Sequence, residues 1–135
     1  MADEYRSFEE FWPFYVKEHT QKANRVLHFA GTSIGLACLA GGLLTKRRWL
    51  LALAPVAGYG GAWIGHFFVE HNKPASWRYP LWSFRADFVM WWKIVRREMD
   101  AEVERVLAEQ KSEAKPAEEQ AASDGHATIQ GETVN

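Results

Sequence analysis

The chain has 135 residues, a length typical of one domain, and its 16 Lys and Arg residues nearly balance its 17 Asp and Glu residues. This balance excludes the bulk basic excess that marks a nucleic-acid-binding protein, and the single cysteine excludes an intrachain disulfide. Aromatic residues make up 14% of the chain, and formal charge is missing from two long stretches, so we do not expect a uniformly soluble globule.

The first 25 residues are rich in aromatic side chains and amphipathic, and we expect them to form helix at the membrane interface. Ser7 and Glu10 have the spacing of a capping box, which predicts a helix start. Pro13 follows six positions after Ser7 and predicts a break, or a later start near Trp12, because proline removes a backbone hydrogen bond.

Two stretches without Asp, Glu, Lys or Arg follow, residues 26–44 and residues 49–69. As helices they would be roughly 28 and 31 Å long, which matches the ~30 Å hydrocarbon core of a membrane. Four residues separate them, which allows only a tight turn, so we predict a two-span helical hairpin. Two buried helices of a soluble bundle are the alternative, which the lack of a polar stripe on either stretch disfavours.

Glycines four residues apart, Gly31 with Gly35 and Gly61 with Gly65, predict that the two helices pack closely. The first apolar stretch lies behind a charged segment and does not resemble a secretory signal. We therefore expect an integral membrane protein, of the endoplasmic reticulum in a eukaryote or of the inner membrane in a bacterium. The distribution of basic residues favours both termini on the cytoplasmic side.

Basic and aromatic side chains alternate through residues 71–97, as is typical of a membrane–water interface. Residues 80–110 contain no Gly or Pro beyond the first position, which predicts one long helix. Residues 112–135 have almost no large apolar side chains and predict a disordered acidic tail. The expected fold is all-α, with one membrane-embedded helical domain over residues 1–111.

Four of the five histidines lie between residues 19 and 71, and His28 and His66 lie near the ends of the two apolar stretches. Ionisable groups are costly in lipid, which makes a functional role the default interpretation. The start of the first helix and the end of the second reach the same membrane surface in an antiparallel hairpin. We therefore expect the rings of His28 and His66 to meet at one depth.

His66 and Glu70 are four residues apart on one helical face, a spacing that can supply two metal ligands. Asn24 and His28 have the same spacing. His71 points about 100° away from Glu70 on a helix and is a secondary candidate.

His19 and His28 are nine residues apart and would lie on opposite faces of one continuous helix. If both bind one metal, the chain must bend between them, near residues 20–22. Imidazole and carboxylate ligands suit Fe(II), Zn, Mn or Ni, and the lack of a thiolate argues against a sulfur site. The candidate ligands that can share one membrane face are His19, His28, His66 and Glu70.

Two other interpretations remain open. His28 and His66 could clamp a b-type haem between the two helices. Alternatively, the histidines are interfacial polar groups of a non-catalytic, lipid-binding membrane protein.

The segments around these histidines resemble the fungal 2-hydroxy fatty acid dioxygenases, the Mpo-like family. One block, HxxxxNxxxH, reads here as His19, Asn24 and His28, and a second block, GHxxxExxxPA, contains His66 and Glu70. The order of the two blocks around an apolar hairpin makes the pattern specific, and the resemblance covers residues 5–95.

The resemblance implies an Fe(II)-dependent dioxygenase that needs no 2-oxoglutarate and uses O₂ to shorten a 2-hydroxy fatty acid by one carbon, in α-oxidation. It implies that His19, His28 and His66 are catalytic and hold the iron, with Glu70 as a further candidate ligand. The expected partners are a 2-hydroxy fatty acid or a related lipid, O₂ and membrane lipids, without nucleic acid.

Other residues have expected supporting roles around such a centre. Arg25 and Arg85 are candidates for binding the carboxylate headgroup of the substrate. Asn24 and Tyr59 are candidates for orienting the second nitrogen of the histidine rings, because metal-ligating histidines need such partners.

Overall fold

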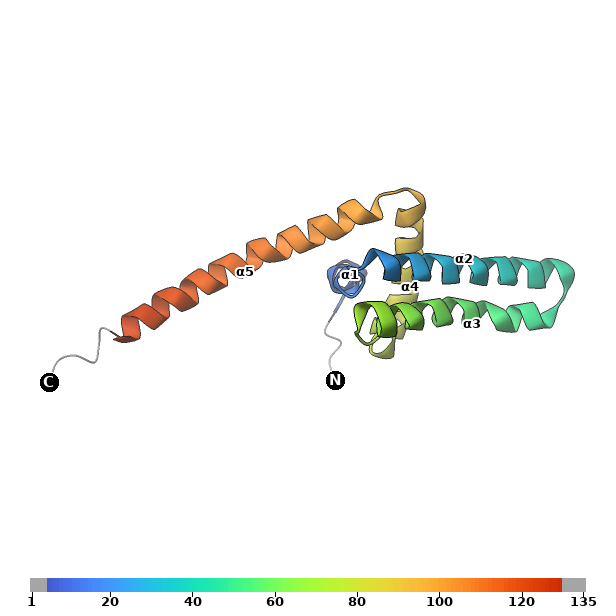
Figure 1. The fold of residues 1–135 in the computed structure, drawn as a ribbon, viewed down its shortest axis with the longest axis horizontal. Helices are drawn as coiled ribbons and strands as arrows, with labels where there is room; N and C mark the ends of the chain where they lie inside the picture. The colour runs from blue at the N-terminus through green and yellow to red at the C-terminus, as the bar shows by residue number, and fades with distance from the viewer. Residues whose placement is uncertain (1–4, 130–135) are drawn as a thin grey trace.

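The computed structural model describes the backbone of residues 5–129 and the side chains as far as residue 114 (Figure 1). The described residues form helices joined by turns, with no strand among them, and this confirms the all-α prediction. The elements that position the site are a short N-terminal helix, a helical hairpin and a helix that crosses the hairpin.

Helix α1 (Phe8–Lys17) begins where the capping box predicts, because the backbone N–H of Glu10 donates to the hydroxyl of Ser7 at 3.2 Å. Pro13 lies inside α1 without ending it, so the predicted break or later start near Trp12 is wrong. The backbone carbonyl that loses its partner to a proline belongs to the fourth residue before it, here Glu9. Glu9 is exposed, and water can replace the missing N–H.

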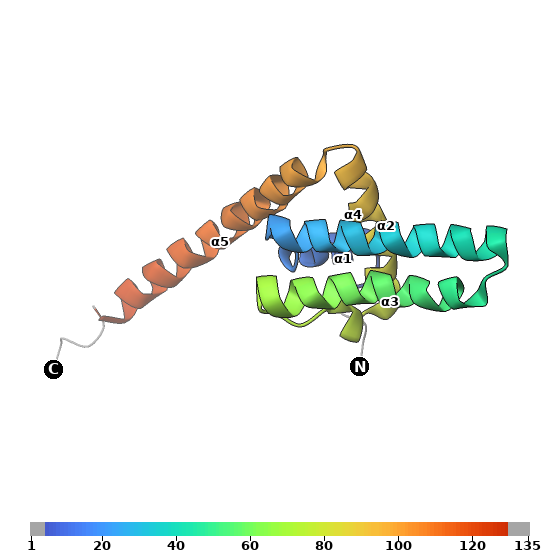
Figure 2. The same ribbon diagram turned by 45° about the vertical axis from the view of Figure 1, so that its right-hand side comes forward.

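Helices α2 (Lys22–Thr45) and α3 (Arg48–Ile64) lie side by side as an antiparallel hairpin (Figures 1 and 2). A Cβ atom on Gly31 would lie 2.7 Å from the carbonyl oxygen of Ala57, and one on Gly61 would lie 2.7 Å from that of Leu27. The two backbones therefore touch at the glycines, which confirms the predicted close packing.

Among the described residues, α2 is the one helix long and apolar enough to span a membrane. Helix α3 has 17 residues, because the backbone changes at Gly65–Glu70 into a π-helical segment, η1. The two-span hairpin is therefore not confirmed by helix length and remains a prediction.

A short 3₁₀ segment, η2 (Ala75–Trp77), leads into α4 (Pro80–Val95), which crosses the hairpin in the half toward its open end (Figure 1). Helix α5 (Met99–Ile129) then leaves the bundle. The single helix predicted over residues 80–110 is wrong, because Arg97 takes a left-handed backbone with φ of 60°.

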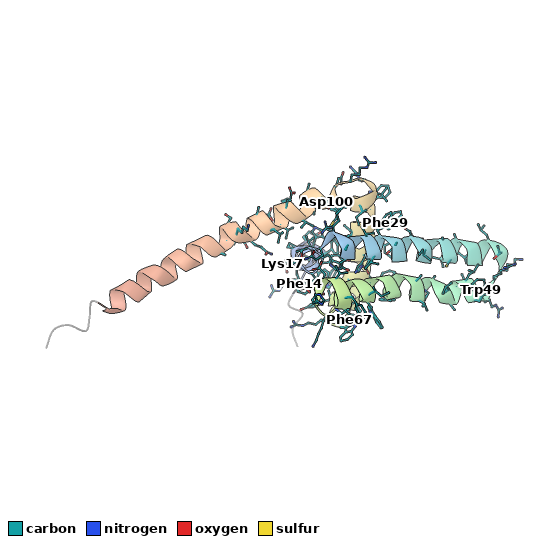
Figure 3. All side chains as sticks on the ribbon, in the orientation of Figure 1. Phe14, Lys17, Phe29, Trp49, Phe67 and Asp100 are labelled. Atoms are coloured by element: carbon teal, nitrogen blue, oxygen red, sulfur yellow. The ribbon has the colours of Figure 1, made fainter. Side chains whose placement is uncertain are left out.

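The turn between α4 and α5 allows α5 to pack its first turns against α1. The indole N–H of Trp12 donates to Glu102 at 2.7 Å, and apolar burial accompanies this contact, so tertiary packing overrides local helix propensity. Side chains crowd into this region in Figure 3. The buried apolar core consists of Phe8, Phe11, Trp12, Tyr15, Val16, Ala75, Tyr79, Ala86, Met90, Met99, Val103 and Val106.

The structure continues α5 as a helix to Ile129, whereas the sequence predicts a disordered tail over residues 112–135. Ala and Glu, which have high helix propensity, make up eight of residues 112–129, whereas Pro116 and Gly125 in the same segment oppose a helix. Residues 130–135 lie outside the described residues. The disorder of the tail and the domain boundary at residue 111 remain predictions.

Candidate metal centre

Three histidines meet at the open end of the hairpin, and each comes from a different part of the chain. His19 lies in the turn after α1, His28 lies in the second turn of α2, and His66 lies in η1. The chain between α1 and α2 is not helical, so the bend predicted near residues 20–22 is present. The antiparallel hairpin brings His28 and His66 to the same level, as predicted.

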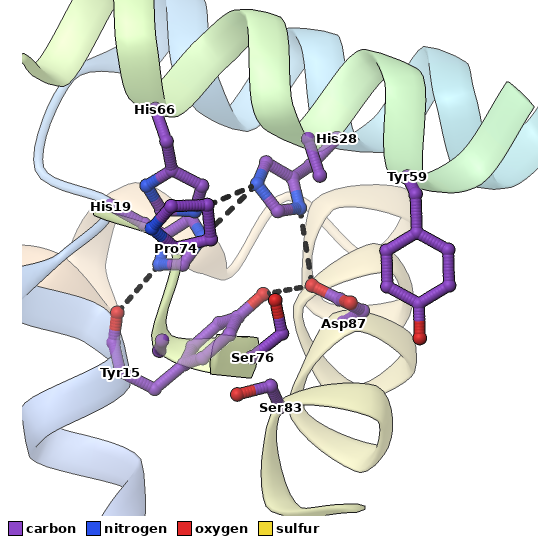
Figure 4. A pocket seen from close by; sticks show the side chains of 11 residues that line it. Tyr15, His19, His28, Tyr59, His66, Pro74, Ser76, Ser83 and Asp87 are labelled. Atoms are coloured by element: carbon purple, nitrogen blue, oxygen red, sulfur yellow. Dashed lines mark hydrogen bonds and ion pairs between the residues drawn. The ribbon is translucent and has the colours of Figure 1, made fainter. Parts of the chain in front are cut away.

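The Nε2 atoms of the three rings point toward one another (Figure 4). The Nε2 atom of His28 lies 3.2 Å from that of His19 and 3.3 Å from that of His66, and one nitrogen from each ring lies within 4.8 Å of the others. The three ring planes are nearly perpendicular to one another, at 78° to 88°. All three side chains are buried, with exposed fractions of 0%, 4% and 2% for His19, His28 and His66.

The opposite nitrogen of each ring, Nδ1, faces an oxygen acceptor. These acceptors fix the hydrogen on Nδ1, so that each neutral ring presents a lone pair on Nε2. The three contacts are those of His19 with the carbonyl of Tyr15 at 2.6 Å, of His28 with Oδ1 of Asp87 at 3.1 Å, and of His66 with Oδ1 of Asn72 at 2.7 Å.

The arrangement could hold a metal ion. Three lone pairs that face one another repel unless a proton or a cation lies between them. At a metal–nitrogen distance of ~2.0–2.1 Å, adjacent ligand nitrogens lie about 2.8–3.4 Å apart in octahedral or tetrahedral geometry. Two of the three separations, at 3.2 and 3.3 Å, lie in this range, and the nitrogens of His19 and His66 lie within 4.8 Å of each other.

Burial favours the neutral imidazole that metal binding requires. It lowers the pKa of His19 well below its ordinary value, and positive charge on His28 or His66 would lower this pKa further. The ring of His19 also stacks on that of Tyr15, with 4.0 Å between the ring centroids, which fixes its plane.

Asp87 on α4 is a functional candidate that the sequence analysis missed. Its Oδ1 atom contacts Nδ1 of His28 and also accepts the hydroxyl hydrogen of Tyr15. Burial and the charge of Asp87 raise the pKa of Tyr15 well above its ordinary value, so this hydroxyl stays a donor. The sequence does distinguish Asp87, because it is the one acidic residue in the otherwise basic segment of residues 71–97.

Asn72 was also missed, and it lies just after η1. His71 takes a left-handed backbone with φ of 57°, and the N–H of Asn72 returns to the carbonyl of His66 at 3.0 Å. The amide of Asn72 donates to Glu18 at 2.7 Å, which orients its oxygen toward His66. The sequence gives no signal for the contact between Asn72 and His66, because this contact depends on the left-handed turn at His71.

The structure places Glu70 outside the histidine group. Its carboxylate accepts the backbone N–H of Gln21 at 2.6 Å and the hydroxyl of Thr20 at 3.3 Å. The free N–H groups at a helix start attract a negative charge, and Gln21 is the N-cap of α2. Glu70 therefore fixes the start of α2 relative to η1.

Arg25, predicted for the substrate headgroup, is instead used inside the fold. Its guanidinium donates to the carbonyls of His19 at 2.8 Å and Thr20 at 2.6 Å, and it pairs with Asp100 at 2.7 Å. These contacts hold the turn that presents His19.

Three other candidates also lie away from the rings. The exposed guanidinium of Arg85 stacks 4.1 Å over the ring of Phe8. The amide of Asn24 donates to Glu70 at 3.5 Å and orients no imidazole, and His71 is exposed.

A chamber of about 10 Å³, with room for about one water molecule, adjoins the three rings, and Tyr59, Ser76 and Ser83 line it together with Asp87 (Figure 4). Tyr59 thus lies beside the centre, although the ring nitrogens have other partners. The hydroxyl of Ser83 is buried and has no hydrogen-bond partner among the described residues. A buried hydroxyl without a partner is costly, so this donor is available to a ligand in the chamber.

A family model described as 2-hydroxy-palmitic acid dioxygenase, Mpo1-like, matches residues 5–99. The match includes all three histidines of the centre together with Asn72 and Asp87. No curated protein and no solved structure gives a significant match to the chain.

Proposed function

The chain belongs to the Mpo1-like family, and we propose that it is an Fe(II)-dependent dioxygenase that shortens a 2-hydroxy fatty acid by one carbon. The description of the family supports the reaction and the class of substrate. The observation that carries the metal is the convergence of three Nε2 atoms whose Nδ1 partners are all in place. We assign His19, His28 and His66 as the iron ligands.

Bound iron would supply the activation of O₂ and an anchor for the carboxylate and hydroxyl oxygens of the substrate. Three protein ligands leave coordination positions open for such groups. The cleavage of the bond between C1 and C2 balances with one O₂ as a fatty acid one carbon shorter, CO₂ and water. This balance needs no further reductant.

The chain itself orients the ligands and excludes water. Asp87 holds the ring of His28, and Asn72 holds that of His66, so each Nε2 stays directed at the ion. The burial of the rings keeps bulk water from the centre.

We assign the binding of one oxygen of the substrate carboxylate to the chamber beside the rings. The unpartnered hydroxyl of Ser83 supports this assignment, because it can donate to an anionic oxygen. Arg25 and Arg85 are not proposed for this role, because the first is committed to backbone carbonyls and Asp100 and the second stacks on Phe8.

We further propose that the hairpin lies in a membrane, with α2 and the continuous segment of α3 and η1 as its two spans. Only 22% of the most apolar window of α2 is buried inside the protein, whereas the core helix of a soluble protein is mostly buried. The histidine centre then lies at one surface of the membrane, where an amphiphilic substrate arrives. The large apolar side chains exposed along these two spans are Val26, Ile34, Leu39, Leu43, Leu44, Trp49, Leu53, Val56, Tyr59, Trp63, Ile64, Phe67 and Phe68.

The haem alternative does not fit the geometry. Two axial nitrogens on opposite sides of one iron would lie about 4 Å apart, twice the ~2.0–2.1 Å of a metal–imidazole bond. The Nε2 atoms of His28 and His66 are 3.3 Å apart, and the ring of His19 occupies the space beside them. A non-catalytic lipid-binding role remains the competing outcome of the test below.

The test is turnover by the purified protein in detergent after reconstitution with Fe(II). We expect O₂ consumption with 2-hydroxypalmitate and the appearance of the acid one carbon shorter, and no reaction with palmitate. A protein that holds no iron and turns over no 2-hydroxy acid, yet still binds lipid, would establish the competing role.

A further inference from the structure

We propose that the apolar groove between α2, α3 and α4 binds the acyl chain of the substrate, and that its far end at Leu39 and Leu51 sets the chain length. This inference rests on the proposed function, because it assumes a fatty acid whose head lies at the histidine centre. It assigns residues that have no part in holding the metal.

The groove adjoins the centre. A cavity of about 290 Å³ runs between the three helices, and His28 and Asp87 line one end of it. His28, Tyr59 and Asp87 line the small chamber beside the rings as well. The two spaces are therefore adjacent, and a fatty acid whose head lies at the rings would direct its tail into the groove.

The groove changes from polar to apolar along its length. Beyond His28, Thr32 and Asp87 its lining is apolar except for the phenol of Tyr59, and Leu36, Ala54 and Phe88 are among its walls. This gradient matches a fatty acid, which carries its polar atoms at one end.

Two glycines of the hairpin have different roles in the groove. Gly35 allows α2 and α3 to approach, because a Cβ there would lie 2.9 Å from the carbonyl oxygen of Ala54. A Cβ on Gly58, in contrast, would meet nothing within 4 Å, so open space lies above this glycine. A larger side chain at position 58 would therefore extend into the groove.

The length of the groove matches one long acyl chain. His28 and Leu39 are eleven residues apart on α2, which is about 16 Å at ~1.5 Å per residue. One chain of a membrane lipid spans half of the ~30 Å hydrocarbon core, a similar length. At the far end the side chain of Leu51 lies against Gly42, where an added Cβ would come within 2.5 Å of it.

The first experiment maps the tail directly in the unmodified protein. The probe is 2-hydroxypalmitate with a photoreactive diazirine at its terminal carbon, added to the purified protein in detergent, with the labelled residues identified by mass spectrometry. We expect labelling at Leu39 and Leu51, reduced by competing 2-hydroxypalmitate. Labelling spread over outward side chains such as Val56 and Trp63, or unaffected by competition, would overturn the assignment.

The second experiment fills the groove from within. Ala54→Phe places a large ring between the centre and the far end, whereas Ala52→Phe adds the same ring to an exposed position of the same helix. We expect Ala54→Phe to weaken the binding of 2-hydroxypalmitate at least tenfold and that of 2-hydroxyhexanoate less than threefold. Ala52→Phe should change neither. Equal effects of the two variants on both acids would contradict the proposal.

The third variant, Leu51→Ala, opens the far end. We expect it to shift the preference from 2-hydroxypalmitate toward 2-hydroxylignocerate by at least fivefold, and an unchanged preference would count against Leu51 as the end of the groove. Iron content is measured for each protein. If the unmodified protein binds no iron, the proposed function is wrong. If iron is bound but Leu51→Ala leaves the chain-length preference unchanged, only the assignment of the groove is wrong.

Discussion

Oδ1 of Asp87 lies 3.1 Å from Nδ1 of His28, on the side of the ring opposite the other two imidazoles. The same oxygen accepts the hydroxyl of Tyr15, so one carboxylate links α1, α2 and α4 behind the centre. A carboxylate in this position fixes the orientation of the ring and raises its basicity as a ligand.

Asp87→Asn tests this link. An amide in place of the carboxylate removes the charge that supports His28, and we expect the affinity for Fe(II) to fall by about 10–100-fold. The measurement is iron binding to the metal-free protein in detergent. Glu109→Gln, the same change at an exposed position of α5, is the control and should leave the affinity unchanged. Equal affinities of Asp87→Asn and the unmodified protein would contradict the orienting role.

Variants of Glu70 distinguish a role as a metal ligand from a role in capping α2. Its carboxylate accepts the N–H of Gln21, so Glu70→Gln can keep that contact through its amide oxygen, whereas Glu70→Ala cannot. We expect Glu70→Gln to retain iron, and Glu70→Ala to lower the free energy of unfolding by roughly 1–3 kcal/mol. Iron analysis and thermal unfolding measure the two effects. Loss of iron from Glu70→Gln, to the extent expected for a His28→Ala variant, would make Glu70 a ligand.

Gly65 leaves the space that Asn24 occupies. A Cβ on Gly65 would lie 1.9 Å from Oδ1 of Asn24, so we expect Gly65→Ala to destabilise the fold by about 1–3 kcal/mol. The second change Asn24→Ala should remove most of this penalty in a double-mutant cycle. Gly60→Ala is the control, because a Cβ there meets nothing within 4 Å. Strictly additive effects of the two changes would show that the overlap is not the cause.

Glu102 predicts a pH dependence of stability. The hydrogen bond from Arg105, and then that from Trp12, lower the pKa of Glu102 from 4.5 to about 2. A carboxylate with a lower pKa in the folded state stabilises the fold above its unfolded pKa, and this contribution is lost as the pH falls from 4.5 to about 2. The unfolding temperature of the unmodified protein should therefore fall more steeply over this range than that of Glu102→Gln. Parallel curves would rule out this contribution.

Much of the centre could be predicted from the sequence, because it depends on local rules. The antiparallel hairpin brings its two ends together, which places His28 near His66. The helical period excludes a continuous helix through His19 and His28, which predicts the bend. The small residues of the hairpin predict its close packing.

The remainder depends on contacts between distant segments. Asp87 reaches His28 because α4 crosses the hairpin, and no periodicity in the sequence indicates that crossing. No Gly or Pro marks the end of α4 at Val95. The helix ends there because the packing of α5 on α1 favours a left-handed turn at Arg97. The spacing of Glu70 and His66 predicts a shared ligand face, but the carboxylate of Glu70 accepts the backbone N–H of Gln21 at the start of α2 instead.

The most direct test of the account is the iron content of three proteins purified in detergent and reconstituted with Fe(II): the unmodified chain, His28→Ala and His71→Ala. His28 contributes the Nε2 atom that lies nearest to both other rings. His71 is the control, because it is exposed and lies outside the three-histidine group. We predict one bound iron per chain in the unmodified protein and in His71→Ala, and at least a hundredfold weaker binding in His28→Ala. Iron bound equally well by all three proteins would contradict the three-histidine centre.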